Sequence, residues 1–300
     1  MATQIDITAS TLLAQKALAP LLNKYPLLSL FSTNFSDDAK GLGQTVNVPV
    51  FGTSEGVAKG VKEAIDHQAE ADGTISEVTV TLGTRCAQTQ TFSAYAVANM
   101  SDDAFAKAIE ASANATVGKA VAMIHALACT PANHLSVTAA SANELAYADV
   151  QAAVLAAANL GLDMDQLVLV LSPAAYVNLR HDEAVTKKFT SVAEEAVKTG
   201  KISELEGMKV VRSAKIPAGY FGYLAVPESI ALAARPFPEI GASWQQVMTA
   251  DGGLAITASG KDEWNSGARS VATALAFGCA AVKAGASDKR IVAIKCGAGS

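Results

Sequence analysis

SDDAFAKAIEASANATVGKAVAMIHALAC, residues 101–129, has the apolar spacing of a single long helix. Its larger apolar side chains recur three, four and eight residues apart, at Phe105, Ile109, Val117, Val121, Ile124 and Ala128. Ser101 can cap the first turn, and Thr130-Pro131 cannot continue the helix. At 1.5 Å per residue, such a helix is roughly 40 Å long. We therefore predict a rigid helix over 101–129, along which the other elements are arranged.

Residues 1–44, before this helix, have the composition of an arm. TLLAQKALAPLLNKY offers a helix from about Thr11 that is bent or ended at Pro20, and Pro26 precedes the apolar piece LLSLF. The large apolar side chains of the arm are Leu12, Leu13, Leu21, Leu22, Leu27, Leu28, Leu30 and Phe31. A short tail cannot leave this many in water. They must be buried against this chain's own body or against a neighbouring molecule, and the sequence leaves both open.

Two alternating segments follow the arm, TVNVPVFG at 45–52 and EVTVTL at 77–82. Each places valine or leucine at every second position, as half-buried strands do, and Pro49 restricts the first strand to an edge or a bulge. The insert between them, 53–76, holds three glycines, many charged residues and no sustained apolar face. A connection of this length within a compact body is uncommon. We predict an extended excursion that leaves the body and returns.

The second half of the chain mixes short strands and helices. Residues 133–160 are Ala-rich and helical in pattern, and the apolar run 167–172 is typical of a buried strand. Ser172 and Pro173 then begin a helix with Tyr176, Val177 and Leu179 on its inner face. Further strands are expected over 208–213, 223–226, 229–235, 254–264, 268–284 and 291–296, with a turn at Asn265-Ser266-Gly267. The elements do not alternate strictly, so the fold class is α+β.

Composition excludes several classes of protein. The chain has 300 residues, is 50% hydrophobic and carries a formal charge of -5 without a Lys/Arg cluster, which argues against a dedicated nucleic-acid binder. Cys86, Cys129, Cys279 and Cys296 are scattered, so we expect idle thiols and neither a zinc site nor a disulfide framework. We expect no membrane segment, because no window approaches eighteen uninterrupted apolar residues, and we expect synthesis in the cytoplasm.

A search for catalytic and ligand-binding motifs nominates no catalytic, cofactor-binding or metal-binding residue. The chain has no P-loop, no G-x-S-x-G elbow and no H-E-x-x-H, and GLGQTV at 41–46 is only a weak match to a dinucleotide turn. The four histidines, His67, His125, His134 and His181, are dispersed. We interpret His125 as structural, a partly charged imidazole near a helix C-terminus. No cofactor is expected.

Several charged and aromatic residues have an ordinary structural interpretation. The acidic residues Glu63, Asp66, Glu70 and Asp72 lack the spacing of a calcium loop and are interpreted as a solvated face. Asp182, Glu183, Glu194 and Glu195 are interpreted as surface charge interleaved with Lys187, Lys188 and Lys198. Trp244 and Trp264 are interpreted as packing residues, since no basic residues surround them as single-strand binding would require.

The order of these parts resembles the major capsid protein of tailed bacteriophages, the Hong Kong 97-type fold. The likeness covers nearly the whole chain, and local phrasing agrees: LVLVLSPAAYVNLRHD, GKISELEGMKVVRSAKIPAG and YLAVPESIALAARP are similar to segments of such coat proteins. It implies an N-terminal arm at 1–44, an extended loop (E-loop) at 45–95, a peripheral (P) domain at 96–145 with the spine helix 101–129, a mainly axial (A) domain at 146–235, and a return to P-domain strands at 236–300.

The resemblance also implies a function. Copies of the chain would tile an icosahedral shell as hexamers and pentamers, located in the virion, with packaged double-stranded DNA in weak, non-specific contact and with scaffolding, portal and decoration proteins as further partners. The loop 53–77 would pack on an adjacent subunit. Some family members crosslink through a loop lysine; Lys59 and Lys62 lie in the corresponding loop, but no partner asparagine is identified. Alternatives are an encapsulin-type nanocompartment shell, a soluble α+β enzyme and a phage adhesin or tail component.

Overall fold

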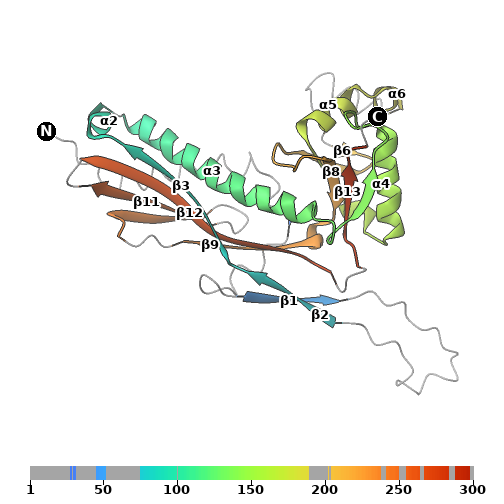
Figure 1. The fold of residues 1–300 in the computed structure, drawn as a ribbon, viewed down its shortest axis with the longest axis horizontal. Helices are drawn as coiled ribbons and strands as arrows, with labels where there is room; N and C mark the ends of the chain where they lie inside the picture. Colours follow the sequence, from blue (N-terminus) through green and yellow to red (C-terminus); the bar gives the residue numbers. More distant parts are fainter. Residues whose placement is uncertain are drawn as a thin grey trace, which may run out of the picture.

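The computed structural model describes residues 28, 30–31, 45–51, 75–99, 101–188, 202, 204–237, 241–249, 255–263, 267–283 and 288–297. These residues form an elongated molecule (Figure 1). A long helix and a sheet lie at one end, and a second sheet, made of shorter strands and covered by helices, lies at the other. A thin two-stranded ribbon extends below the body. Most of the predicted arm and residues 52–74 of the predicted loop lie outside the described residues.

The predicted long helix is confirmed as α3, Asp102–Ala128. The Ser101 hydroxyl accepts a hydrogen bond from the amide N of Ala104 at 3.3 Å, so the predicted N-cap is also confirmed. The six apolar positions that define its period are all buried. Helix α3 therefore begins and ends where its local sequence specifies.

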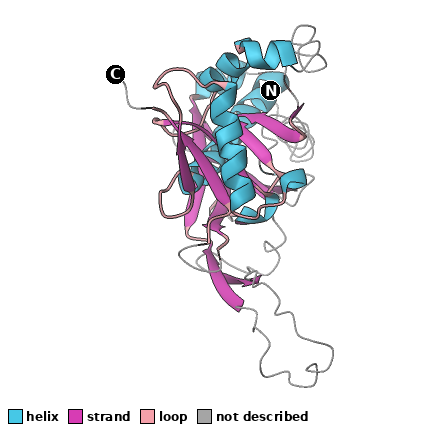
Figure 2. Cartoon of the chain, turned by 90° about the vertical axis from the view of Figure 1, so that its right-hand side faces the viewer, coloured by secondary structure: helices cyan, strands magenta, loops and turns pink. Residues whose placement is uncertain are grey.

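A five-stranded antiparallel sheet runs along α3 (Figures 1 and 2). Its strands are β10 (Trp244–Thr249), β11 (Ala255–Glu263), β12 (Ala268–Ala281), β3 (Thr84–Phe92) and β9 (Ile230–Pro236), and the short helix α2 (Ala94–Asn99) follows β3. β12 pairs with β11, β3 and β9. The hydroxyls of Ser112 and Thr116 on α3 lie 3.0 and 2.9 Å from the hydroxyl of Thr273 on β12. These buried contacts fix the register of the helix on the sheet.

A six-stranded mixed sheet lies beyond the C-terminal half of α3, in the order β4-β13-β8-β5-β7-β6. Its strands are β4 (Leu135–Thr138), β13 (Ile291–Lys295), β8 (Tyr220–Ala225), β5 (Val168–Leu171), β7 (Met208–Arg212) and β6 (Glu204–Leu205). Alternate residues of the central strands pack either toward α3 or toward the helices of the far face. The chain is thus a layered α+β structure.

The helices of the far face are α4 (Tyr147–Asn159), α5 (Pro173–His181) and α6 (Glu183–Lys188), with short 3-10 turns η3 (Met164–Gln166) and η4 (Pro227–Ser229). The predicted start of α5 is confirmed, because the Ser172 hydroxyl accepts from the amide N of Ala175 at 3.3 Å. Two predictions here are wrong in part. Residues 135–138 form β4 because they pair with β13, and Val177 is 43% exposed on α5 because it lies on the outward side of the helix.

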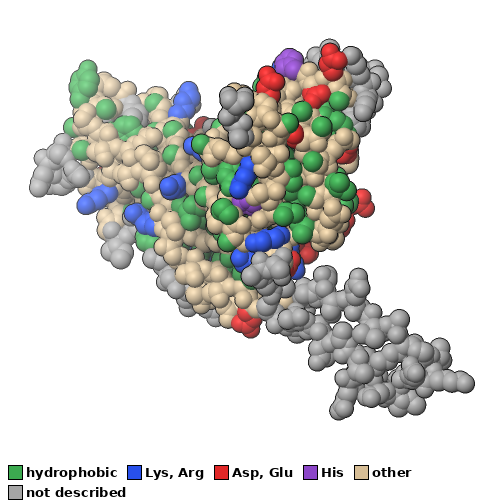
Figure 3. Space-filling view, turned by 45° about the vertical axis from the view of Figure 1, so that its right-hand side comes forward, with side chains coloured by type: hydrophobic (Ala, Val, Ile, Leu, Met, Phe, Trp, Pro, Cys, Tyr) green, Lys and Arg blue, Asp and Glu red, His purple; other side chains and the backbone are tan. Residues whose placement is uncertain are grey.

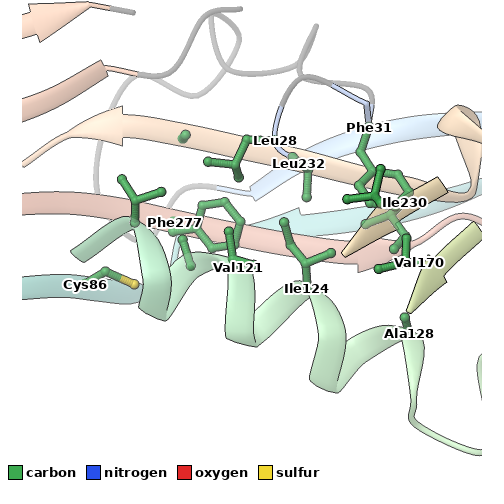
Figure 4. Packing of buried hydrophobic residues seen from close by; sticks show 14 of the residues in the cluster. Leu28, Phe31, Cys86, Val121, Ile124, Ala128, Val170, Ile230, Leu232 and Phe277 are labelled. Atoms are coloured by element: carbon green, nitrogen blue, oxygen red, sulfur yellow. The ribbon is translucent and has the colours of Figure 1, made fainter. Parts of the chain in front are cut away.

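The described part of the arm is buried in this chain's own core. Leu28 and Phe31 are each 4% exposed and belong to the same cluster as Val121 and Ile124 of α3. Figure 4 shows Leu28 beside Leu232, and Phe31 beside Ile230, on the side of the sheet where α3 lies. The sequence left open whether the arm is buried against this chain or against a neighbouring molecule. Leu28 and Phe31 are buried against this chain.

The ribbon consists of β1 (Thr45–Phe51) and β2 (Ile75–Thr81), paired antiparallel, which confirms both predicted strands. Val46, Val48 and Val80 of the ribbon, together with Leu82, are buried against Ala231 and Ala233 of β9. The end of β2 crosses β12 at Gly278, where an added Cβ would lie 2.3 Å from the carbonyl oxygen of Thr81. Only a glycine allows this close approach, so Gly278 sets where the ribbon leaves the body.

Candidate functional site

A conventional active site is not evident among the described residues. They contain no group of three or more His, Cys, Asp or Glu side chains placed to hold a metal ion. An open hollow of about 260 Å³ lies between the start of α4 and the end of α5, lined by Glu144, Leu145, Ala146, Asn178, His181 and Asp182. Both carboxylate oxygens of Asp182 accept backbone N–H groups, from Tyr147 and Ala184, at 2.7 Å. This carboxylate therefore holds the start of α4 and the start of α6 in place.

His125 is the most deeply buried titratable group of α3. Its Nδ1 lies 3.0 Å from the hydroxyl of Tyr223 and its Nε2 lies 2.7 Å from the hydroxyl of Ser213. If the buried Tyr223 hydroxyl donates to Nδ1, then Nε2–H donates to Ser213, and each of the three groups has a partner. In this tautomer Nε2 carries its own proton and cannot activate Ser213. His125 joins α3 to the six-stranded sheet.

The predicted charge state of His125 is wrong. Burial lowers its pKa from 6.5 to about 4, so the imidazole is neutral at neutral pH and does not act as a cation at the helix C-terminus. Lys283 and Lys289 instead bring positive charge to this end, by donating to the carbonyl oxygen of Ala132 just beyond the helix. The structural role predicted for His125 agrees with its contacts, but the physical reason is hydrogen bonding.

Lowering the pH is expected to destabilise the subunit through His125. Above pH 6.5 the imidazole is neutral in the folded and unfolded states, so the folded state has its full stability. As the pH falls toward 4, the unfolded chain binds a proton first, and stability decreases by about 1.4 kcal/mol per pH unit. Urea unfolding at about pH 7.5 and about pH 5 measures the loss, expected at about 2 kcal/mol. His125→Gln should lose less over this interval; an equal loss in both proteins contradicts the prediction.

An acidic corner, defined here as Glu144, Asp182, Glu204 and Glu206, lies near Tyr147 at the start of α4, and two of its members contact this tyrosine. The Tyr147 hydroxyl donates to the carboxylate of Glu206, and its backbone N–H donates to Asp182. Burial, followed by the contact with Glu206, raises the pKa of Tyr147 to about 12, so the phenol stays protonated and remains a donor. Glu144 lines the hollow together with Asp182.

A basic edge, defined here as Leu135, Lys283, Lys289 and Lys295, lies along β4. Lys295 is opposite Thr138 of β4 in the register of the sheet, and Lys283 donates to Asn133 Oδ1 at 3.2 Å, two residues before the strand. Nearby, Arg290 is paired with Asp288 at 3.3 Å. Figure 3 shows acidic side chains gathered at the upper right of the molecule and a group of Lys and Arg side chains lower on the same face. The two charge types are therefore segregated.

Apolar side chains are also exposed on the described surface. The large ones are Tyr95, Leu135, Leu155, Met164, Val177 and Val247, and Tyr95 on α2 is 82% exposed. They lie on different elements, so they form no single groove. The outward face of the ribbon is polar instead: Asn47 donates to Glu77 at 3.0 Å and accepts from Thr79 at 3.3 Å.

The residues singled out in the sequence do not converge on one place. His134 is buried and lies within hydrogen-bonding distance of the Ala128 carbonyl, whereas His181 is exposed beside Arg180. Trp244 packs against Phe105 with ring centroids 6.5 Å apart, which confirms its packing role. The four cysteines are free thiols, as predicted. His67, Lys59, Lys62, Trp264, the four acidic loop residues and Glu194, Glu195 and Lys198 lie outside the described residues.

The described helices contain none with the combined length and apolar character needed to cross a membrane. The basic edge and the acidic corner were both missed by reasoning from the sequence. Lys283, Lys289, Arg290 and Lys295 fall within thirteen residues, so a count of charge in that window could have found the basic edge. Glu144 is 60 residues from Glu204, so the acidic corner is assembled only by folding.

Comparison with known proteins gives a likeness of fold. No family model and no curated protein sequence matches the chain. Among solved structures, one of Mycobacterium phage Che8 is 14% identical with a TM-score of 0.64, covering 90% of each chain. The capsid of Ralstonia phage GP4 is 11% identical with a TM-score of 0.59, covering 87% of this chain and 85% of that one. A virus-like particle from Pyrococcus furiosus is 13% identical with a TM-score of 0.50, covering 94% and 97%.

Proposed function

Because the chain has the Hong Kong 97-type fold that its sequence predicted, we propose that it is a major capsid subunit that self-assembles into an icosahedral shell around phage double-stranded DNA. One observation carries the proposal: the likeness to the structure from Mycobacterium phage Che8 covers 90% of both chains. In this function copies of the chain are its main partners, in hexamers and pentamers, and the virion is its location.

The two layered sheets support an assignment of two domains within the subunit. We assign the P domain to α3 and the five-stranded sheet, and the A domain to the six-stranded sheet with α4, α5 and α6. This assignment differs from the predicted bounds, because it moves β4 and β13 into the A domain and β3 and β9 into the P domain. We assign the ribbon to the extended loop. Synthesis in the host cytoplasm, weak DNA contact, and scaffolding, portal and decoration proteins as further partners belong to the same proposal.

A second candidate function is an encapsulin-type nanocompartment. The structural likeness to the virus-like particle from Pyrococcus furiosus supports it, since that likeness also spans almost the whole chain. In both functions the chain is the repeating subunit of a closed shell, and the two functions differ in what the shell encloses. The proposal that the chain is not an enzyme is supported by the hollow beside α4, where the carboxylate of Asp182 is held by backbone N–H groups.

The purified protein is expected to form particles far larger than its 30.7 kDa monomer, because each subunit of a shell contacts several neighbouring subunits. Light scattering gives the mass, and electron microscopy shows whether the particles are rings or closed shells. A clean monomer at high concentration contradicts the shell function. Particles isolated from the native source and found to enclose enzymes in place of phage DNA support the nanocompartment.

A further inference from the structure

We infer that neighbouring subunits meet through opposite edges of the six-stranded sheet: the basic edge of one copy docks on the acidic corner of the next. This inference rests on the proposed shell function and names a contact within it. β4 and β6 are the two edge strands of that sheet in the described structure. The basic edge lies along β4, and Glu204 on β6 and Glu206 just after it bring the acidic corner to the other edge, while Glu144 and Asp182 come from the ends of neighbouring helices. A contact between two different surfaces of identical copies is heterologous, and it closes into a ring when the rotation between copies allows it.

The basic edge has unused capacity to bind carboxylates. Lys283 donates to Asn133 and Ala132, and Lys289 donates to Ala132, so each ammonium group, with three N–H donors, keeps at least one for a further acceptor. Lys295 stands with its Nζ 5.9 Å from the Tyr220 ring centroid. Because Arg290 is paired with Asp288, the three lysines dominate the charge of this edge. Leu135, 39% exposed, adds an apolar contact among them.

The acidic corner supplies the complementary charge. Glu206 is held in place by Tyr147 and by Gln151, whose Nε2 lies 3.5 Å from the same carboxylate oxygen, so its second oxygen can face outward. Glu204 lies opposite Lys209, which neutralises part of the charge, whereas Glu144 stands at the exposed rim of the hollow. Complementary charge across an interface fixes register and rejects wrong pairings more than it adds affinity.

Charge reversal tests the contact. In Lys283→Glu/Lys289→Glu both surfaces carry a net negative charge, and in Glu144→Lys/Glu204→Lys the acidic corner loses its net negative charge. Each variant alone is expected to raise the concentration needed for ring formation by about tenfold or more, because the attraction between the two surfaces is removed or reversed. An equal mixture of the two variants is expected to form rings again, since each reversed edge meets a reversed corner. Alternation requires an even number of copies, so six-membered rings are expected without five-membered ones.

Controls separate this inference from folding and from the shell function. Lys119→Glu/Lys261→Glu makes the same charge change on exposed positions of α3 and β11 and is expected to assemble as wild type does. Thermal melting checks that each subunit folds. If Lys283→Glu/Lys289→Glu does not fold, Lys283→Gln/Lys289→Gln replaces it in the test. This variant is expected to assemble more weakly than wild type, and its assembly should depend less on salt concentration.

Three results would overturn the inference while leaving the shell function intact: normal assembly of both reversed variants, no recovery in the mixture, or normal assembly with loss of retention on a heparin column. The last result would assign the basic edge to nucleic acid. Absence of any assembly by the wild-type chain would instead overturn the shell function on which the inference rests.

Discussion

Replacing Leu28 and Phe31 together by alanine is expected to lower the free energy of unfolding of the subunit by about 5 kcal/mol or more. Both side chains are 4% exposed in the main core, where they pack beside α3 against β9. Truncation of one buried leucine costs about 2–5 kcal/mol and of one phenylalanine about 3–5 kcal/mol. Because whole domains are stable by only about 5–15 kcal/mol, a large fraction of the variant should be unfolded.

Urea denaturation of the dissociated subunit, followed by circular dichroism, measures this change. Leu155→Ala is the matched control, because Leu155 is 63% exposed on α4 and its truncation leaves no cavity. If the double variant unfolds at the same urea concentration as wild type, these arm residues do not belong to the core. If instead the subunit is unaffected and only assembled particles are weakened, the arm is an intersubunit element at these positions.

Gly278→Val is expected to displace the root of the ribbon and to prevent assembly. A Cβ at this position would lie 2.3 Å from the carbonyl oxygen of Thr81, and the opposing atoms are backbone, which cannot rotate away. β12 is held by pairing with β9 at this point, so the ribbon is the part that must shift. The shift exposes the valines that pack on Ala231 and Ala233, and we expect a loss of about 3 kcal/mol, at the upper end of the usual overpacking range.

Thermal melting and electron microscopy of the Gly278→Val chain test both consequences. Gly83→Ala is the control at the same junction, because a Cβ there would meet only the Thr81 methyl group at 3.7 Å, an ordinary contact. The control should assemble normally with a melting temperature close to that of wild type. Normal shells from Gly278→Val would mean that the crossing of β2 over β12 is not required in the assembled subunit.

Part of the fold was predictable because its signals are local. Helix α3 has an apolar period and a cap, β1 and β2 alternate, and β5 leads into α5 through Ser172-Pro173. β3, β4 and β10 were not predicted from their own residues. β4 has four residues that are mostly exposed, and β3 is polar at many positions. Such segments become strands because a neighbouring strand (β12 for β3, β13 for β4 and β11 for β10) offers its backbone.

The candidate contact surfaces were not predicted from the sequence either. A formal charge of -5 describes the whole chain, and it gave no indication that lysines gather along β4 while carboxylates gather around Tyr147. The likeness to a capsid fold was predictable from the order of the elements, because that order is itself a property of the sequence. Which side of each element faces a neighbour depends on packing between distant segments.

The sequence by itself determined the long helix, the alternating strands, the lack of a catalytic motif and the order of parts, since each depends on spacing within a short window. Only the tertiary structure decided that Leu28 and Phe31 enter this chain's own core, that His125 is neutral, and that lysines gather along β4 while carboxylates gather near Tyr147. The physical reason is that burial, pKa and surface charge depend on groups that folding brings together from far apart in the chain.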